Sequence, residues 1–115
     1  MTHLALLVTT IVTATCYHAV AGQCNDDYLT TASGKKIEST ENAYDHRYVA
    51  ASRDLLADYP YGTAILVTDA EVEEYNGIWY VEDTMNKRFT ETIDFLINPD
   101  MQVQNSKVTI QKIEQ

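Results

Sequence analysis

The sequence has few basic residues. Eight Lys and Arg stand against 17 Asp and Glu, which gives a formal net charge of −9 at pH 7. Binding to nucleic acid requires a basic patch that neutralises phosphates, and these eight cations are spread along the chain. We therefore expect no nucleic-acid partner. The same charge repels anionic polymers, so an anionic ligand would have to be held by local contacts.

Glycine, proline and long apolar runs are also scarce. The 115 residues include four Gly and two Pro, with no repeat and no low-complexity linker. We therefore expect one domain, large enough for a single hydrophobic core. The apolar stretch near the N-terminus is too short and too rich in Thr to cross a membrane, so we expect no membrane span.

Cysteine is limited to Cys16 and Cys24. In an oxidising compartment the two would close a small loop as a disulfide, which would contribute about 2–3 kcal/mol. In a reducing compartment they would stay free thiols. His18 lies between them, but structural zinc needs four ligands, usually with paired spacing, and no second pair exists. We therefore expect no metal and no cofactor.

Two interpretations fit the N-terminal region. The apolar residues 4–14 and the small residues "AVA" before Gly22 are typical of an export leader, although no Lys or Arg stands near the start. The segment "VTTIVTATCYHAV" (8–20) is equally typical of a β-strand, and cleavage after Ala21 would remove it. We assign residues 1–7 to a leader or N-terminal extension and residues 8–115 to the folded domain. We expect export to the periplasm, cell envelope or extracellular space, and a cytoplasmic location stays open.

Six segments rich in β-branched and aromatic residues predict short strands. They are residues 8–20, 47–52, 62–69, 75–83, 92–97 and 106–114. Asn76-Gly77 predicts a hairpin turn, and "RDLLADYPYG" predicts a brief helical turn that ends before Pro60. Residues 22–46 are polar and rich in turn formers. Many short strands with little helix indicate a small β-barrel.

The order of the motifs resembles a known family. "VTATCYHA", "TASGKKI", "VAASRDLL", "YPYGTAILV", "VEDTMNKRFTETIDFLI" and "KVTIQKI" follow one another along residues 8–113. This order is similar to the double-psi β-barrel of RlpA-like proteins, above all the three-aspartate (3D) domain branch. A-type membrane-bound lytic transglycosylases, family 45 endoglucanases and barwin/expansin proteins share that barrel. The resemblance implies a mainly β fold: a small six-stranded double-psi β-barrel with short helical turns.

Two aspartates carry the most specific part of the resemblance. Asp83-Thr84 and Ile93-Asp94 keep the family's spacing of eleven residues, and Asp54 stands at the place of the remaining aspartate. The family's glycines after the first aspartate are replaced by "MNKRF", and its polar-Arg pair by Glu91-Thr92. In an arbitrary sequence Asp83 would be a plain turn residue. We interpret Asp54 as structural, a cap of the turn "DLLAD".

The resemblance implies that Asp94 is a general acid/base and Asp83 its neighbouring carboxylate. Strand alternation aims Asp94 opposite Ile93 and Phe95, and a carboxyl at the rim of an apolar barrel has its pKa raised by desolvation. We expect the two aspartates to meet at the mouth of the barrel. Further contacts to a sugar polymer are expected from Tyr17, Thr84, Tyr80, Lys87 and Arg88. Trp79 and Tyr80 alternate, so one of them should face the core.

Three functions fit this set of residues. The first is cleavage of peptidoglycan glycan strands by a lytic-transglycosylase-like lyase. The second is a non-catalytic module that binds peptidoglycan or a related glycan polymer on the same barrel. The third, an endoglucanase-like inverting hydrolase, is weaker because that group has its base aspartate next to the first-strand tyrosine. Here His18 follows Tyr17, and the nearest acids are Asp26 and Asp27.

Overall fold

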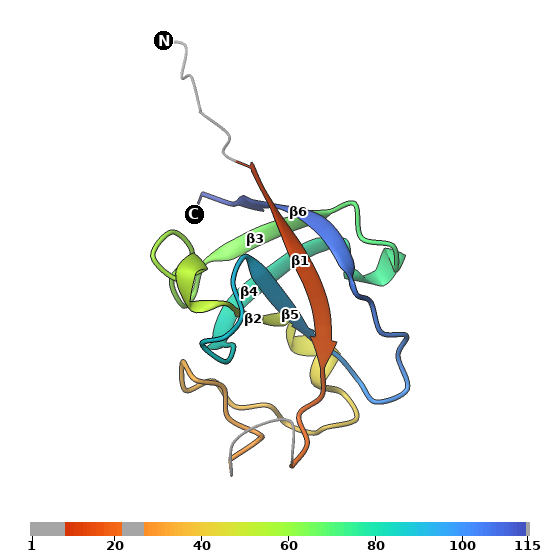
Figure 1. Ribbon diagram of the computed structural model, residues 1–115. Helices are drawn as coiled ribbons and strands as arrows, with labels where there is room; N and C mark the ends of the chain where they lie inside the picture. The colour runs from red at the N-terminus through yellow and green to blue at the C-terminus, as the bar shows by residue number, and fades with distance from the viewer. Residues whose placement is uncertain (1–8, 22–26, 115) are drawn as a thin grey trace.

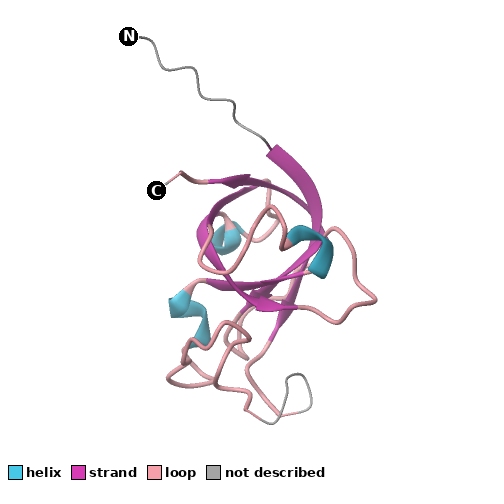
Figure 2. Cartoon of the chain, turned by 90° about the vertical axis from the view of Figure 1, so that its left-hand side faces the viewer, coloured by secondary structure: helices cyan, strands magenta, loops and turns pink. Residues whose placement is uncertain are grey.

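The computed structural model describes residues 9–21 and 27–114. Six strands close into a barrel, seen from the side in Figure 1 and close to end-on in Figure 2. The strands are β1 (Thr9–Tyr17), β2 (Tyr48–Ala51), β3 (Ala64–Thr68), β4 (Gly77–Thr84), β5 (Thr92–Leu96) and β6 (Ser106–Lys112). Each falls within one of the segments that the sequence predicts as a strand, apart from the last residue of β4.

The strands follow one another around the barrel in the order β1-β5-β2-β4-β3-β6. Strand β1 runs parallel to β5, and β2 parallel to β4. The other pairings are antiparallel, including β1 with β6, which places Thr9 opposite Gln111. The predicted mainly β class and six-stranded barrel are confirmed. The two parallel pairs join strands that are not consecutive in sequence, and the double-psi connectivity stays a prediction.

Strand alternation fills the barrel interior with large apolar side chains. Trp79 and Phe95 are fully buried, with ring centroids 4.6 Å apart, and Tyr75 stacks on Phe95 at 5.1 Å. The same interior cluster includes Val12, Ala14, Val49, Ala51, Ile65, Val67, Val81, Ile93, Ile97, Val108 and Ile110. As expected from their alternation, Trp79 faces the core, whereas Tyr80 is 37% exposed on the outer side.

A second apolar cluster lies on the outer side of the barrel wall. It contains Tyr17, Ala19, Ile37, Ala43, Ala50, Met85 and Leu96. Strands β1, β2 and β5 supply the wall, and the segment before β2 supplies the cover. This segment crosses one end of the barrel in Figure 1 and Figure 2. The described part of this polar segment, for which the sequence predicts no strand, therefore forms a separate layer on the barrel.

Three short 3₁₀ turns complete the described elements: η1 (Ala43–His46), η2 (Arg53–Leu55) and η3 (Glu73–Tyr75). The turn η2 begins the segment that predicted a helical turn. The hairpin prediction at Asn76-Gly77 is wrong in its position. Strands β3 and β4 do pair antiparallel, but Gly77 already pairs with Val67, and the connection runs through η3. The Asn76 side chain instead accepts a hydrogen bond from Ala70 N at 2.9 Å, which closes this longer loop.

The two predicted disulfide partners are not both described. Cys16 is half-buried, and its thiol is free within the described part of the chain. Burial raises the pKa of this thiol to about 11. Cys24 lies outside the described residues, so the disulfide stays a prediction. Over residues 9–21 and 27–114, no helix is long and apolar enough to cross a membrane.

Candidate functional site

The site is built on one row of residues that crosses four neighbouring strands. Thr15 of β1 pairs with Asp94 of β5, and Asp94 pairs with Ala50 of β2. Ala50 pairs on its other side with Asp83 of β4. Residues paired in this way project from the same face of a sheet. The two aspartates therefore flank the small Ala50 side chain, with their Cα atoms about 10 Å apart, two strand spacings.

This row lies on the outer face of the barrel wall. The neighbours of Asp94 in β5, Ile93 and Phe95, are buried in the interior, as alternation predicts. Ala50 and Leu96 belong instead to the outer cluster. The two aspartates share this outer face and line one pocket. They meet beneath the segment that covers the wall.

A β-bulge puts Asp83 on this face. Val81 pairs with Val49, but the next residue of β2, Ala50, pairs with Asp83, so Glu82 is an extra residue in β4. Trp79 and Val81 point into the core, and strict alternation would have turned Asp83 inward after them. A bulge shifts the phase of a strand by one residue and re-aims the side chain that follows.

Three hydrogen bonds fix the carboxylate of Asp83. The Tyr17 hydroxyl donates to Oδ2 at 3.1 Å. The backbone N–H groups of Ala32 and Thr84 each donate to Oδ1 at 3.0 Å. Ala32 belongs to the "TASG" motif, a turn closed by a bond from Gly34 N to Thr31 O. This motif therefore holds one of the two aspartates in place.

Asp94 is in a different environment. It accepts one short hydrogen bond, from Thr15 Oγ1 to Oδ1 at 2.7 Å. Burial raises the pKa of Asp94 to about 6, the Thr15 bond lowers it, and the negative charge of Asp83 raises it further. The expected desolvated acid is thus present. Two neighbouring carboxyl groups with different surroundings are typical of acid/base sites.

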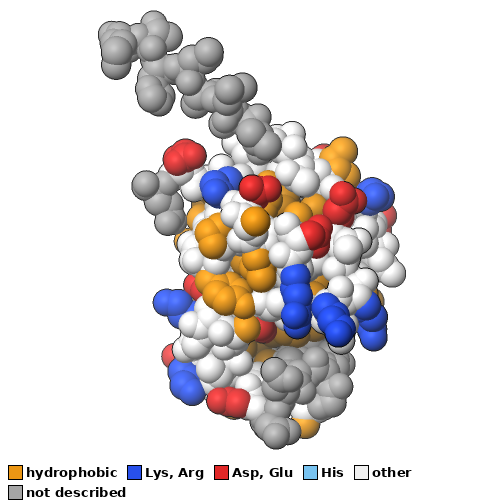
Figure 3. Space-filling model, turned by 60° about the vertical axis from the view of Figure 1, so that its left-hand side comes forward, with side chains coloured by type: hydrophobic (Ala, Val, Ile, Leu, Met, Phe, Trp, Pro, Cys, Tyr) orange, Lys and Arg blue, Asp and Glu red, His pale blue; other side chains and the backbone are white. Residues whose placement is uncertain are grey.

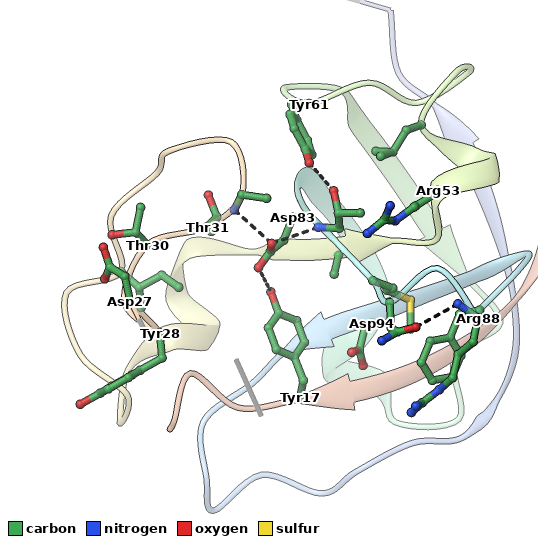
Figure 4. A pocket seen from close by; sticks show the side chains of 18 residues that line it. Tyr17, Asp27, Tyr28, Thr30, Thr31, Arg53, Tyr61, Asp83, Arg88 and Asp94 are labelled. Carbon is green, nitrogen blue, oxygen red and sulfur yellow. Dashed lines mark hydrogen bonds between the residues drawn. The ribbon is translucent and has the colours of Figure 1, made fainter. Parts of the chain in front are cut away.

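Both aspartates line one pocket of about 1140 Å³, shown in Figure 4. It opens between the barrel wall, the segment around Thr31, η2 and the β4–β5 loop. Figure 4 places Asp27, Tyr28 and Thr30 on one side and Arg53 and Arg88 on the other. On the face seen in Figure 3, hydrophobic side chains gather left of the centre, with several Lys and Arg side chains to their right.

The pocket brings together some of the predicted contact residues. Tyr17, Thr84 and Arg88 line it with the two aspartates. The Thr84 hydroxyl is hydrogen-bonded to the Tyr61 hydroxyl. Tyr80 and Lys87 do not line this pocket. Their contact with a ligand stays a prediction, and it would have to be made outside the pocket.

Asp54 is exposed and lies outside the pocket lining. It is the second residue of η2, and it accepts a hydrogen bond from Glu91 N at 3.0 Å. Bonds from Ser52 and Glu91 lower its pKa. The contact is therefore a tie from η2 to the residue before β5, rather than a cap of the turn "DLLAD".

Sequence reasoning missed several residues of the pocket. Thr15 was part of a strand without a role, and its pairing with Asp94 depends on a parallel contact between distant strands. Arg53 stands beside the conspicuous Asp54, yet it is the arginine that lines the pocket. The aromatic lining comes from Tyr28, Tyr61 and Phe89 together with Tyr17. The motif "TASG", which follows Tyr28 closely, and the motif "YPYG", which contains Tyr61, were the signals from which these two tyrosines could have been found.

No group of three or more His, Cys, Asp or Glu side chains within the described ranges is arranged to hold a metal ion. Comparison of the chain with family models, curated proteins and solved structures gives no match.

Proposed function

We propose that this domain cleaves glycan strands of peptidoglycan in the manner of a lytic transglycosylase, with Asp94 as the acid/base. One observation carries the proposal: a carboxyl with a pKa of about 6 lies beside a second, firmly bound carboxylate in a large pocket. A general acid near neutral pH needs a pKa in this region. The motif order that resembles RlpA-like and 3D domains adds independent support for the same two aspartates and for an exported location.

The proposed reaction needs one residue to move protons. Asp94, protonated, donates its proton to the glycosidic oxygen as the C1–O bond of the muramic sugar breaks. Positive charge that develops on the sugar is stabilised by the ionised Asp83. The C6 hydroxyl of the same sugar then attacks C1, and the Asp94 carboxylate takes its proton. A C–O bond is exchanged for another C–O bond, and Asp94 returns to its starting state without a cofactor.

The bonds of Asp83 favour this route over hydrolysis. Its three donors hold the carboxylate against the wall and leave it as an electrostatic partner of Asp94. Hydrolysis with inversion requires a second carboxylate free to activate water. Asp27 lines the same pocket, but it forms an ion pair with Lys36 at 3.9 Å. The two routes differ in their products, because the transglycosylase route releases an anhydro sugar end and hydrolysis releases a reducing end.

The remaining lining suits a polar sugar polymer. Tyr17, Tyr28, Tyr61 and Phe89 supply aromatic surface, and Thr30, Thr31 and Thr84 supply hydroxyl groups. Tyrosine combines an apolar ring with a hydrogen-bonding tip, which fits sugars that stack and donate hydrogen bonds. The alternative is a binding module without turnover, because the same lining would hold a glycan if Asp94 never transferred a proton.

The test is incubation of the purified protein with peptidoglycan sacculi, followed by mass spectrometry of the soluble products. Asp94→Asn removes the acid, and Asp100→Asn is the matched control, because it makes the same change on an exposed residue outside the pocket. Anhydromuropeptides from wild type and control, but not from Asp94→Asn, are expected. Reducing-end products would indicate a hydrolase. Absence of products together with sedimentation of all three proteins with the sacculi would leave the binding module.

A further inference from the structure

Two arginines line the pocket of a strongly acidic protein. The chain has eight Lys and Arg and a net charge of −9, and Arg53 and Arg88 both line the pocket, Arg53 on the side of Asp83 and Arg88 on the side of Asp94. Arg53 comes from η2, and Arg88 from the loop between β4 and β5. Cations at this place need an explanation, because the rest of the molecule repels anions.

Hydrogen bonds tie the segments that carry these arginines to each other. Ser52 and Thr92 exchange two, from Ser52 N to Thr92 O at 2.9 Å and from Thr92 N to Ser52 Oγ at 3.1 Å. Asp54 accepts a third from Glu91 N. The segments on which Arg53 and Arg88 stand are therefore held together. Asp54, the carboxylate next to Arg53, is directed to a backbone N–H.

Neighbouring carboxylates do not neutralise the two arginines by ion pairing. Lys36 and Asp27 form the ion pair that is found within the described part of the chain. Neither Arg53 nor Arg88 forms an ion pair there. The Arg88 guanidinium lies 4.7 Å from the centre of the Phe89 ring, which leaves its edge free for an acceptor. The described partners of Asp83 and Asp94 are hydroxyl and backbone N–H groups.

The two cations also do little to Asp94. Burial and the charge of Asp83 raise the pKa of Asp94 and the Thr15 hydrogen bond lowers it, whereas neither arginine contributes. A guanidinium directed at Asp94 would have lowered that pKa. Both arginines line the pocket, where they would contact a bound ligand.

We propose that Arg53 and Arg88 determine specificity by binding a carboxylate on the glycan. This inference rests on the pocket described above being a glycan site, and it names the ligand class as acidic sugars. The planar guanidinium binds a carboxylate through two parallel N–H···O bonds, which also fixes orientation. The carboxylate would be either the lactyl group of muramic acid or the carboxyl of a uronic acid.

Binding of three tetrasaccharides tests the proposal. They are peptide-free alternating N-acetylglucosamine and N-acetylmuramic acid, hyaluronan tetrasaccharide, and the neutral chitotetraose. Titrations are followed by NMR at low salt, with every protein in an Asp94→Asn background that prevents turnover. The variants are Arg53→Gln, Arg88→Gln and the double change. Lys107→Gln is the matched control, because Lys107 is exposed on β6 and outside the pocket.

At least one acidic tetrasaccharide should bind about tenfold more tightly than chitotetraose, and the double variant should lose that preference. Lys107→Gln should keep it. Preference for the muramic ligand alone assigns the lactyl carboxylate, and preference for hyaluronan assigns a uronic acid. Equal affinity for all three sugars, no binding of either acidic one, or a preference kept by the double variant would overturn the proposal. If the protein prefers acidic sugars but does not cleave sacculi, the proposed enzymatic activity is wrong and the arginine proposal stands. If it cleaves sacculi without this preference, only the proposed role of the arginines is wrong.

Discussion

At the scale of single residues, Asp94 is a carboxyl placed where its charge is costly. Burial and the charge of Asp83 raise its pKa to about 6 from an ordinary value near 3.8. The folded protein therefore holds this proton more tightly than the unfolded chain does. Its contribution to stability is fully present below pH 3.8 and is lost as the pH rises through about 6. A site that gains a usable acid thus loses stability at neutral pH.

Asp94→Asn should make the protein more stable at pH 7.5 and leave stability nearly unchanged at pH 4. Two pKa units correspond to about 3 kcal/mol, so a gain of about 1–3 kcal/mol in the free energy of unfolding is expected at pH 7.5. The amide oxygen can still accept the Thr15 hydrogen bond. Urea denaturation at the two pH values measures the difference. An equal effect at both, or a loss of stability at pH 7.5, would show that Asp94 is not desolvated.

Thr15 acts on the chemistry through Asp94, as a positioning residue. Its hydroxyl donates to Oδ1 at 2.7 Å and lowers the pKa of Asp94. Thr15→Val keeps the shape and removes the donor, so the pKa should rise above its present value of about 6. The pH at which cleavage declines should move upward by the same amount. Thr13→Val, at the edge of the same strand face, is the control, and an unchanged pH profile for Thr15→Val would contradict this role.

At the scale of elements, the strands were predictable and their effect on the site was only partly so. The β-branched runs predicted all six strands, because local composition decides them. The resemblance in motif order and in the spacing of Asp83 and Asp94 predicted that the two acids share a cleft. The bulge at Glu82 was not predictable, because it depends on how Val49 and Ala50 of a distant strand pair with β4. That one extra residue turns Asp83 from the barrel interior to the outer face, where Asp94 already lies by strand alternation.

The β4–β5 loop contains a strained residue that can be relieved. Glu91 has a φ of 49°, a left-handed conformation that disfavours a side chain, and its backbone N–H binds Asp54. Glu91→Gly should keep that hydrogen bond and stabilise the fold by about 0.5–1 kcal/mol, since the relieved strain exceeds the added freedom of the unfolded chain. Thermal unfolding checks this. Glu91→Val should have the opposite sign, and a destabilising Glu91→Gly would contradict the expectation.

At the scale of the whole molecule, the charge of −9 opposes compactness. Ion pairing offsets little of it, since Lys36 and Asp27 form the ion pair found in the described ranges and both side chains are largely exposed. Repulsion between exposed carboxylates is screened by salt. The midpoint of urea unfolding should therefore rise between 20 and 300 mM NaCl. Lys107→Glu should enlarge this rise, and a midpoint that falls with salt would show that attraction dominates instead.

The barrel, the covering segment and the charge distribution converge on one pocket. The central claim is that the Asp94 carboxyl in this pocket protonates a glycosidic oxygen. The most direct measurement is the initial rate of soluble-product release from sacculi between pH 4 and 9, for wild type and Asp94→Asn. Above a pH of about 6, the pKa of Asp94, the wild-type rate should fall about tenfold per pH unit, and the variant should release nothing at any pH. An initial rate that does not change with pH in this range, or activity that survives in Asp94→Asn, would contradict the claim.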